Sequence, residues 1–359
     1  MNAPLPLLDL LGARWNIDAP VVAACWDFTG GHVAFAVGDG RVIVVRSDWP
    51  GGPAVASGRD GRIVVTPLRM PPPTPRAVAV HDGACLSLAA DPDGGFLSGG
   101  DDGMLWHIAV DGATALRAQQ FNQWIDFIAT APNGSRAYAS GRSVFWLESI
   151  KPLQFPSSVT ALVYDRASQR LAVAHQGAVT LVSDTAAAVT LVAPGLPRTL
   201  AFGPGDHYLV AGLQENRLCG WRLSDFGTLE IGGYPGQPRS LSFLADGHLL
   251  ATSGATRIIC WPFAPPQAGD VPLECGGAGK APLQHVACHP RLPLIAAGYH
   301  SGAALLCRPD HETPLLLKDA SGSPISALAW SPDGNHLAYA SAAGEIGLVH
   351  LPPILFRPV

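Results

Sequence analysis

Two arginines at equivalent positions of a repeated segment are the residues whose type and spacing most directly suggest chemistry. Arg198 lies in PRTLAF and Arg239 in PRSLSF, each just before an apolar run. A guanidinium offers forked donors that match the oxygens of a carboxylate or phosphate. The pair therefore predicts one of two roles. Either both arginines bind an anionic group of a partner, or each pairs with a neighbouring acid or carbonyl of the chain.

The other copies of the segment carry further polar side chains at related positions. Four residues before the end of the first apolar run lie Val22, Asp126, Thr160, Gln284 and Ser326. The turn after the second apolar run carries Asp101, Asp102, Arg142, His175, Glu215, Arg257, His300 and Glu345. A mixed polar rim of this kind is typical of a protein-binding surface. Asp101 and Asp102 are expected to shape their own turn.

Two tryptophans outside the apolar runs are candidate interface anchors. Trp49 and Trp124 fall in loops or near strand starts. Tryptophan is enriched among the residues that dominate binding energy at protein interfaces. For Trp124 the sequence leaves two roles open, an anchor for a partner or a cap on the core of its own repeat.

The histidines and cysteines do not predict a metal site or a catalytic group. His32, His207, His248 and His336 occur at one repeated position, so each belongs to a different copy. Zinc needs ligands within about 2.0–2.3 Å of one ion. The sequence contains no CxxC, GxxxxGK[ST], GxSxG or HExxH motif. We therefore expect no catalytic residues, no metal and no cofactor.

Composition narrows the class of protein. Lys and Arg total 23 against 28 Asp and Glu, a formal net charge of -5, and no basic stripe predicts nucleic-acid binding. No apolar run reaches the length of a membrane span, and the N-terminal segment lacks the pattern of a signal peptide. Seven cysteines at scattered positions favour reduced thiols, so we expect a cytoplasmic protein. The Ala, Gly, Pro and Arg usage is associated with GC-rich bacterial genomes.

Internal similarity predicts the fold. Eight copies share an apolar strand, a turn such as PDG, a second strand, a Gly-containing turn and a third strand. Most copies lie 34 to 45 residues apart, the length of a four-stranded propeller blade. The exception is the interval of 64 residues between the first two copies. The first apolar strands of the eight copies end at Trp26, Ala90, Thr130, Tyr164, Phe202, Phe243, Cys288 and Trp330.

The sequence therefore predicts a single all-β domain over residues 1–359, a closed β-propeller of antiparallel blades. Eight blades are expected, with seven as the alternative. Residues 7–14 are expected to supply the missing outer strand of the last blade and close the ring, which removes exposed edges. The expected repeat units are 21–69, 84–119, 124–155, 159–192, 198–231, 239–274, 285–318 and 324–351.

Several motifs resemble the WD-repeat family. They are SPDG at 331–334, DPDG at 91–94 and GGDDGMLWH at 99–107, with third-strand tryptophans at Trp106, Trp146, Trp221 and Trp261. None of these tryptophans precedes the Asp of the family motif, and His81-Asp82-Gly83 is the nearest match to its Gly-His pair. The buried Ser/Thr-His-Asp-Trp network that the resemblance implies is therefore expected to be mostly missing.

The resemblance implies a non-catalytic scaffold that binds another protein or a peptide. We expect the partner on the face around the channel mouth, together with an insertion at 48–61. One alternative is a propeller enzyme or small-ligand binder, such as a metal-assisted lactonase. Another is an obligate subunit whose apolar tails, LPLLDLL and PPILF, are buried against another chain. The sequence predicts no oligomeric state.

Overall fold

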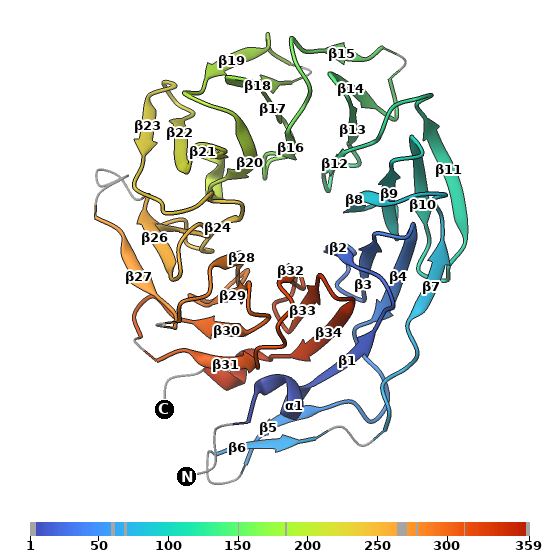
Figure 1. Ribbon diagram of the computed structural model, residues 1–359, viewed down its shortest axis with the longest axis vertical. Coiled ribbons are helices and arrows are strands. Elements are labelled where there is room, and N and C mark those ends of the chain that lie inside the picture. Colours follow the sequence, from blue (N-terminus) through green and yellow to red (C-terminus); the bar gives the residue numbers. More distant parts are fainter. Residues whose placement is uncertain are drawn as a thin grey trace.

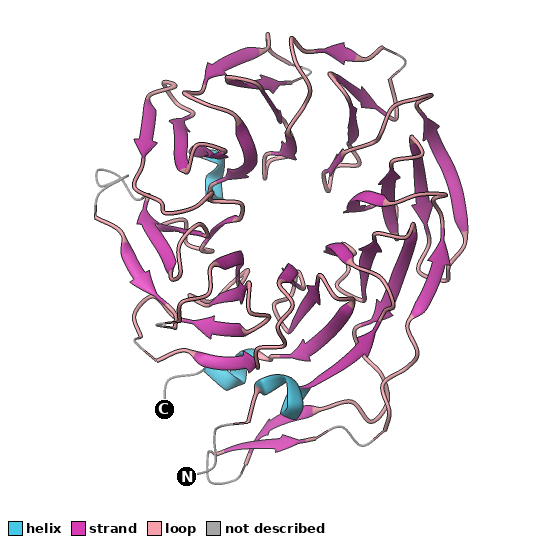
Figure 2. Ribbon diagram, viewed as in Figure 1, coloured by secondary structure: helices cyan, strands magenta, loops and turns pink. Residues whose placement is uncertain are grey.

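The strands form eight four-stranded antiparallel sheets, which surround a central axis as the blades of a ring (Figure 1). The computed structural model describes residues 5–58, 62–67, 70–149, 151–183, 185–263, 271–277, 279–311 and 313–356. Helix is confined to α1 (Leu7–Leu11) and the short 3-10 turns η1 (Pro204–Asp206) and η2 (Pro353–Phe356) (Figure 2). The prediction of an eight-bladed all-β propeller is confirmed, and the seven-bladed alternative is not.

The first four blades follow one another along the chain, each from an inner to an outer strand. Blade 1 contains β2 (Val21–Trp26), β3 (His32–Val37), β4 (Arg41–Arg46) and β7 (Arg76–Ala79). Blade 2 contains β8 (Cys85–Ala90), β9 (Phe96–Gly100), β10 (Met104–Ile108) and β11 (Thr114–Gln119). Blade 3 contains β12 (Phe127–Thr130), β13 (Arg136–Ser140), β14 (Ser143–Trp146) and β15 (Leu153–Gln154). Blade 4 contains β16 (Ala161–Tyr164), β17 (Leu171–His175), β18 (Ala178–Val182) and β19 (Val189–Val192).

The last four blades repeat this order, and the final outer strand comes from the N-terminus. Blade 5 contains β20 (Pro197–Phe202), β21 (Tyr208–Leu213), β22 (Arg217–Arg222) and β23 (Thr228–Ile231). Blade 6 contains β24 (Leu241–Phe243), β25 (Leu249–Thr252), β26 (Ile258–Pro262) and β27 (Leu273–Cys275). Blade 7 contains β28 (Leu283–Cys288), β29 (Ile295–Tyr299), β30 (Ala304–Cys307) and β31 (Leu315–Lys318). Blade 8 contains β32 (Ile325–Trp330), β33 (His336–Ser341), β34 (Glu345–His350) and β1 (Gly12–Asn16).

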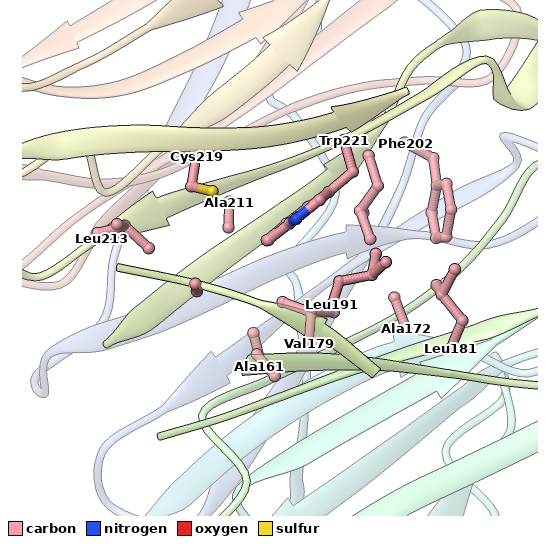
Figure 3. Close-up of a cluster of buried hydrophobic side chains, with 13 residues drawn as sticks. Ala161, Ala172, Val179, Leu181, Leu191, Phe202, Ala211, Leu213, Cys219 and Trp221 are labelled. Carbon is pink, nitrogen blue, oxygen red and sulfur yellow. The ribbon is translucent and has the colours of Figure 1, made fainter. Parts of the chain in front are cut away.

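The core lies between neighbouring blades, because each sheet packs both of its faces against the next. Between blades 4 and 5, Trp221 packs in one cluster with Val179 and Leu191, and all three side chains are buried (Figure 3). Truncating a buried tryptophan to alanine costs about 3–5 kcal/mol. Packing of this kind explains why the middle strands read as nearly continuous apolar runs rather than alternating ones.

Side chains also bond the innermost strands of neighbouring blades to one another. Trp26 Nε1 donates to the carbonyl of Ala329 at 2.9 Å, and Trp330 Nε1 donates to the carbonyl of Ala287 at 3.0 Å. Hydroxyl groups do the same between blades 2 and 3, 4 and 5, and 6 and 7, from Ser87, Thr160 and Ser240 to Ile125, Pro197 and Val286. These bonds link neighbouring blades near the inner edge of the ring.

The N-terminal segment closes the ring, but with different bounds from those expected. Strand β1 pairs with β34 from Gly12↔Val349 to Asn16↔Glu345. Residues 7–11 were expected to belong to this strand and instead form helix α1, so the prediction of a strand over 7–14 is wrong in its first part. The four leucines of LLDLL, separated by a single acid, place Leu8 and Leu11 on one buried side. That spacing is the period of a helix.

The long first interval also differs from the prediction. The expected repeat unit 21–69 places the outer strand of blade 1 before residue 69, where RIVVTPL at 62–68 is the apolar segment. This segment instead contributes β6 (Ile63–Thr66), which pairs only with β5 (Ala54–Ser57), and β7 completes the blade. Val55 and Val65 of this hairpin pack against the α1 side of the ring, whereas Ile63 and Val64 are exposed.

The two apolar tails pack against this chain itself. Leu8 and Leu11 of α1 are buried in a cluster with blades 7 and 8, and Leu355 and Phe356 of η2 pack at its edge. The β5–β6 hairpin lies beside α1 at the outer rim (Figure 1). The apolar surface that the sequence leaves for another chain is therefore largely covered within this one.

Candidate functional site

The direction of the strands gives the ring two different faces. Each inner strand begins at the upper face, which carries the connections between blades and the turns between second and third strands. The turns between first and second strands and between third and fourth strands form the lower face. Backbone bonds such as Ile125 N to Gly100 O join the two kinds of upper loop.

At the channel mouth, the inner strands begin with residues that depart from regular strand pairing. In blades 1, 5, 7 and 8 the pairing register shifts by one residue, which leaves Val22, Arg198, Gln284 and Ser326 as the extra residue of a bulge. In blades 3, 4 and 6, Asp126, Thr160 and Arg239 come just before the inner strand. Bulges of this kind redirect a side chain away from the sheet. The ring of residues that the repeats predict thus lies at the start of the inner strands.

Arg198 and Arg239 are exposed on neighbouring blades. Arg239 Nε donates to Gln237 Oε1 at 3.2 Å, and its backbone N–H donates to Ser253 Oγ. Within the described part of the chain, neither guanidinium lies within ion-pair distance of a carboxylate. Of the two roles that the sequence leaves open, local pairing occurs in part: Arg239 pairs with the amide carbonyl of Gln237, whereas pairing with an acid occurs for neither arginine among these residues.

His285 lies beside the second arginine. Burial, together with the positive charge of Arg239, lowers the pKa of His285 to about 4. The imidazole is therefore neutral at pH 7 and adds no charge to the two arginines. Gln284, the preceding residue, is half-buried in the bulge of β28.

Asp126 carries the only carboxylate among the predicted mouth residues. Burial raises the pKa of Asp126 above its ordinary value. A hydrogen bond or a cation would have lowered that pKa, and the described residues supply neither. The carboxylate is thus partly desolvated and unpaired, on the side of the mouth away from Arg198 and Arg239.

The predicted rim residues do not form one uniform group. Arg142 and His300 are exposed in the upper turns of blades 3 and 7. Glu215 is also exposed, but its carboxylate accepts the backbone N–H of Leu196. Arg257 lies 3.8 Å from Glu274, so its charge is shared within blade 6.

Two of the predicted contact residues do not lie at the upper rim. His175 is buried, where its Nε2 bonds to Thr180 Oγ1 at 2.9 Å and its ring packs against Phe155 at 5.4 Å. His175 is the last residue of β17, and these contacts show that its side chain faces the blade interior rather than the turn. Trp49 is half-buried against the cluster between blades 8 and 1.

The insertion at 48–61 was expected to bind the partner together with the channel-mouth face, but its described residues lie on a different part of the ring. The insertion follows β4, a third strand, and third strands end at the lower face. Its hairpin then runs outside the ring beside α1 (Figure 1). Trp49 and the hairpin are therefore separated from Arg198 and Arg239 by the depth of a blade.

Trp124 lies on the upper connection between blades 2 and 3, and 60% of it is exposed. Phe121 on the same connection is 80% exposed, a residue that the sequence interpretation did not single out. Of the two roles left open for Trp124, capping the core falls instead to the buried Ile125. The signal for Phe121 was available, since it stands three residues before Trp124 in a polar segment.

Blade 2 contains a buried polar network that was expected to be mostly missing. His81 Nδ1 bonds to Asp102 at 3.0 Å, and its Nε2 bonds to Ser98 Oγ at 3.0 Å. In blade 6, Tyr234 takes an equivalent place: its hydroxyl bonds to Thr252 at 2.6 Å and accepts Trp261 Nε1. The family-like network is thus complete from His to Ser in one blade and replaced by tyrosine in another.

Asp101 and Asp102 shape their turn, as expected. Asp101 accepts the backbone N–H of Ala84 at 2.8 Å. Asp102 accepts the backbone N–H groups of Asp82 and Met104 in addition to bonding His81. These two carboxylates therefore hold the connection between blades 1 and 2 to the upper turn of blade 2.

The lower face holds several cavities, of which two are lined by aromatic side chains and histidines. One, of about 540 Å³, lies between blades 5 and 6 and is lined by His207, His248 and a floor of Phe243 and Phe263. The other, of about 460 Å³, lies where the inner strands of blades 4 to 8 end. Among the described residues, no three His, Cys, Asp or Glu side chains are grouped to hold a metal ion. No helix in that part of the chain is long and apolar enough to cross a membrane.

Two parts of the chain match known families. Residues 75–107, which span the described His81 network of blade 2, match the WD domain, G-beta repeat. Residues 286–352, in blades 7 and 8, match the Anaphase-promoting complex subunit 4 WD40 domain. No curated protein shows significant similarity to the chain. Together with the eight four-stranded blades, these two matches support a WD-repeat β-propeller.

Proposed function

We propose that the chain is a non-catalytic scaffold that binds a partner protein or peptide on its upper face, over the channel mouth. The observation that carries this proposal is the pair Arg198 and Arg239. Both are exposed at equivalent positions of neighbouring blades, and neither has a carboxylate partner among the described residues. A scaffold role is also common for WD-repeat propellers.

The chemistry of the pair indicates what it binds. Two guanidiniums one blade apart offer forked donors to a carboxylate or a phosphate group. The neutral state of His285 keeps a third charge out of the site, and the amide of Gln284 adds a donor. We therefore expect an acidic side chain, a chain terminus or a phosphorylated residue of the partner at this position.

Affinity purification from the native cell tests the proposal. The experiment compares the wild type with Arg198→Glu/Arg239→Glu and with Arg222→Glu/Arg308→Glu, which makes the same charge change on the lower face. Circular dichroism confirms that both variants fold. The proposal predicts a protein that is enriched with the wild type and the lower-face variant and lost with the upper-face variant. A partner that returns with all three, or no partner with any, would contradict it.

In keeping with this role, we propose a cytoplasmic location. The cysteine side chains support it, because all seven are free and most are buried as small apolar residues. Fractionation of the native cell, with the protein detected by antibody, tests the location. Recovery in the membrane or secreted fraction would overturn it.

A further inference from the structure

The connection between blades 2 and 3, residues 120–126, presents two aromatic side chains to solvent from a backbone that is held firmly. Phe121 and Trp124 are the two large apolar residues exposed on it. Exposed aromatic groups at the centre of a polar rim are typical of interaction sites. The rest of the connection shows how it is fixed.

Hydrogen bonds along its whole length attach this connection to the ring. The N–H of Gln120 donates to Gly103 O at 2.8 Å, and Gln120 Nε2 donates to the hydroxyl of Tyr138 at 2.9 Å. Gln123 Oε1 accepts from Ser140 Oγ at 3.1 Å. The N–H of Ile125 donates to Gly100 O at 3.0 Å, and its side chain is fully buried.

The backbone conformation confirms how tightly this connection is packed. Gly103 has φ +73°, and an added Cβ there would collide with the carbonyl oxygens of Gln120 and Gln123. Between the two aromatic residues, Asn122 adopts a φ of 58°, a left-handed conformation that is unusual for a residue other than glycine. A connection fixed in this way loses little conformational entropy on binding, which favours affinity.

The charge around this connection is negative. The upper loops of blades 1 to 3 carry the carboxylates of Asp18, Asp39, Asp82, Asp101, Asp102 and Asp126. The guanidiniums there are Arg41, which pairs with Asp39, and Arg142. Asp126 is partly desolvated and has no partner among the described residues, so a cation from outside the chain would relieve its unfavourable environment.

We propose that the 120–126 connection binds a basic segment of the partner, whose arginine or lysine stacks on Trp124 or Phe121 and pairs with Asp126. Stacking of a cation on an aromatic face and pairing with a carboxylate both attract the same group. This inference rests on the proposed function and places opposite charges of one partner on opposite sides of the channel mouth. The basic group lies over blades 2 and 3, and the acidic group lies at Arg198 and Arg239 of blades 5 and 6.

A library of random linear heptapeptides displayed on phage, selected on the wild-type chain, tests the inference. We expect the selected peptides to be enriched in arginine or lysine and to bind more weakly as salt is added. Their affinities are then measured by fluorescence polarisation against four variants that melt at the wild-type temperature. Trp124→Ala and Asp126→Asn change the site. Phe226→Ala and Asp18→Asn are matched controls, an exposed aromatic on the lower face and an acid on a different upper connection.

The inference predicts that Trp124→Ala weakens binding about 30-fold, as a dominant interface tryptophan does. Asp126→Asn is expected to weaken it about fivefold, and both controls to stay within about twofold of the wild type. The inference would be overturned if no peptides were selected or if the selected peptides lacked basic residues. It would also be overturned if basic peptides bound both site variants with the wild-type affinity. If peptides are selected and only Arg198→Glu/Arg239→Glu abolishes their binding, the inference fails while the proposed function stands.

Discussion

On the lower face Arg136 lies among Asp91, Asp93 and Glu148, whereas on the upper face Arg198 has no carboxylate near it among the described residues. Other lower-face arginines are also paired with nearby acids: Arg46, Arg170, Arg222 and Arg308 with Asp48, Asp165, Asp225 and Asp310. These five arginines of the lower face are thus used within the chain, where they order turns and brace blades, while Arg166 and Arg291 on the same face have no carboxylate partner among the described residues.

The upper face has charged residues of both kinds, those paired within the chain and those without a partner among the described residues. Asp101 and Asp102 bond to backbone and to His81, so they hold the ring together. Asp126, Arg198 and Arg239 do not, although they occupy comparable positions at the mouth. The comparison teaches that a charged residue on this ring is a binding candidate when the fold leaves it without a partner, not when it stands in a particular repeat position.

The largest effect on stability is expected from Asp91→Ala on the lower face. The side chains of Asp91 and Arg136 are 2% and 12% exposed, and Arg136 Nε donates to Asp91 at 2.8 Å. Removing the carboxylate leaves a buried guanidinium, which costs about 3 kcal/mol, near the lower end for such pairs because Asp93 and Glu148 remain. Denaturant unfolding measures the loss. In the matched variant Arg308→Ala, which removes an exposed pair, less than about 1 kcal/mol should be lost.

The lower face should also make the fold sensitive to acid. Burial, together with the charge of His350, lowers the pKa of His336 to about 4, against the opposing effect of Asp333 and Asp48. The unfolded chain, with a histidine pKa of about 6.5, takes up the proton first. Stability is therefore complete above about pH 6.5 and decreases as the pH falls to about 4, by about 3 kcal/mol.

The variant His336→Phe checks this assignment. It removes the titrating group while keeping a ring beside Trp26 and His350. The free energy of unfolding should then depend less on pH between 6.5 and 4 than in the wild type. The remaining dependence should include that of His285 on the upper face, whose pKa is also about 4. An unchanged slope would show that other groups cause the acid sensitivity.

Asp102→Ala is expected to have an intermediate effect. The carboxylate bonds His81 and two backbone N–H groups, and the side chain of His81 is fully buried. Leaving that imidazole with only Ser98 as a partner costs about 1–3 kcal/mol. Thermal unfolding of the variant measures the cost. A melting temperature equal to that of the wild type would mean that blade 2 is held by packing alone.

The smallest effects should come from the unpaired charges of the upper face. Asp126→Asn removes a desolvated carboxylate, and Arg198→Glu/Arg239→Glu changes exposed side chains with no acid partner among the described residues. Each should alter the free energy of unfolding by no more than about 0.5 kcal/mol. Calorimetry of both variants beside Asp91→Ala measures the contrast. A loss of 2 kcal/mol or more in either variant would give these side chains a structural role.

The repeated features of the fold could be predicted from the sequence, because they depend on residues close together in the chain. The turn at Ser331–Gly334, for example, is specified by its own Pro, Asp and Gly, and Gly334 adopts a φ of 74°. The helix at Leu7–Leu11 was missed because five apolar-rich residues fit a strand or a helix equally well. The position of RIVVTPL was predicted wrongly because Ile63–Thr66 and Arg76–Ala79 are both short segments that can form a strand, and local sequence does not decide which of them pairs with β4.

The candidate site was predicted only in part, since partners distant in sequence decide which charges are free. The Arg198 and Arg239 pair followed from repeat spacing alone. The assignment of His175 failed because its burial depends on Phe155, twenty residues earlier in the chain. The network between His81 and Asp102, and the ion pair between Asp91 and Arg136, join residues too far apart for spacing to reveal.

Hydrogen–deuterium exchange of the chain, alone and with the partner captured by affinity purification, tests the central claim most directly. Binding at the upper face predicts slower exchange at the connections 120–126, 193–199, 232–240 and 319–325. Exchange at the lower-face turns 91–95 and 331–335 should not change. Slower exchange confined to the lower turns, or to the β5–β6 hairpin, would contradict the proposal that the unpaired charges of the upper face bind the partner.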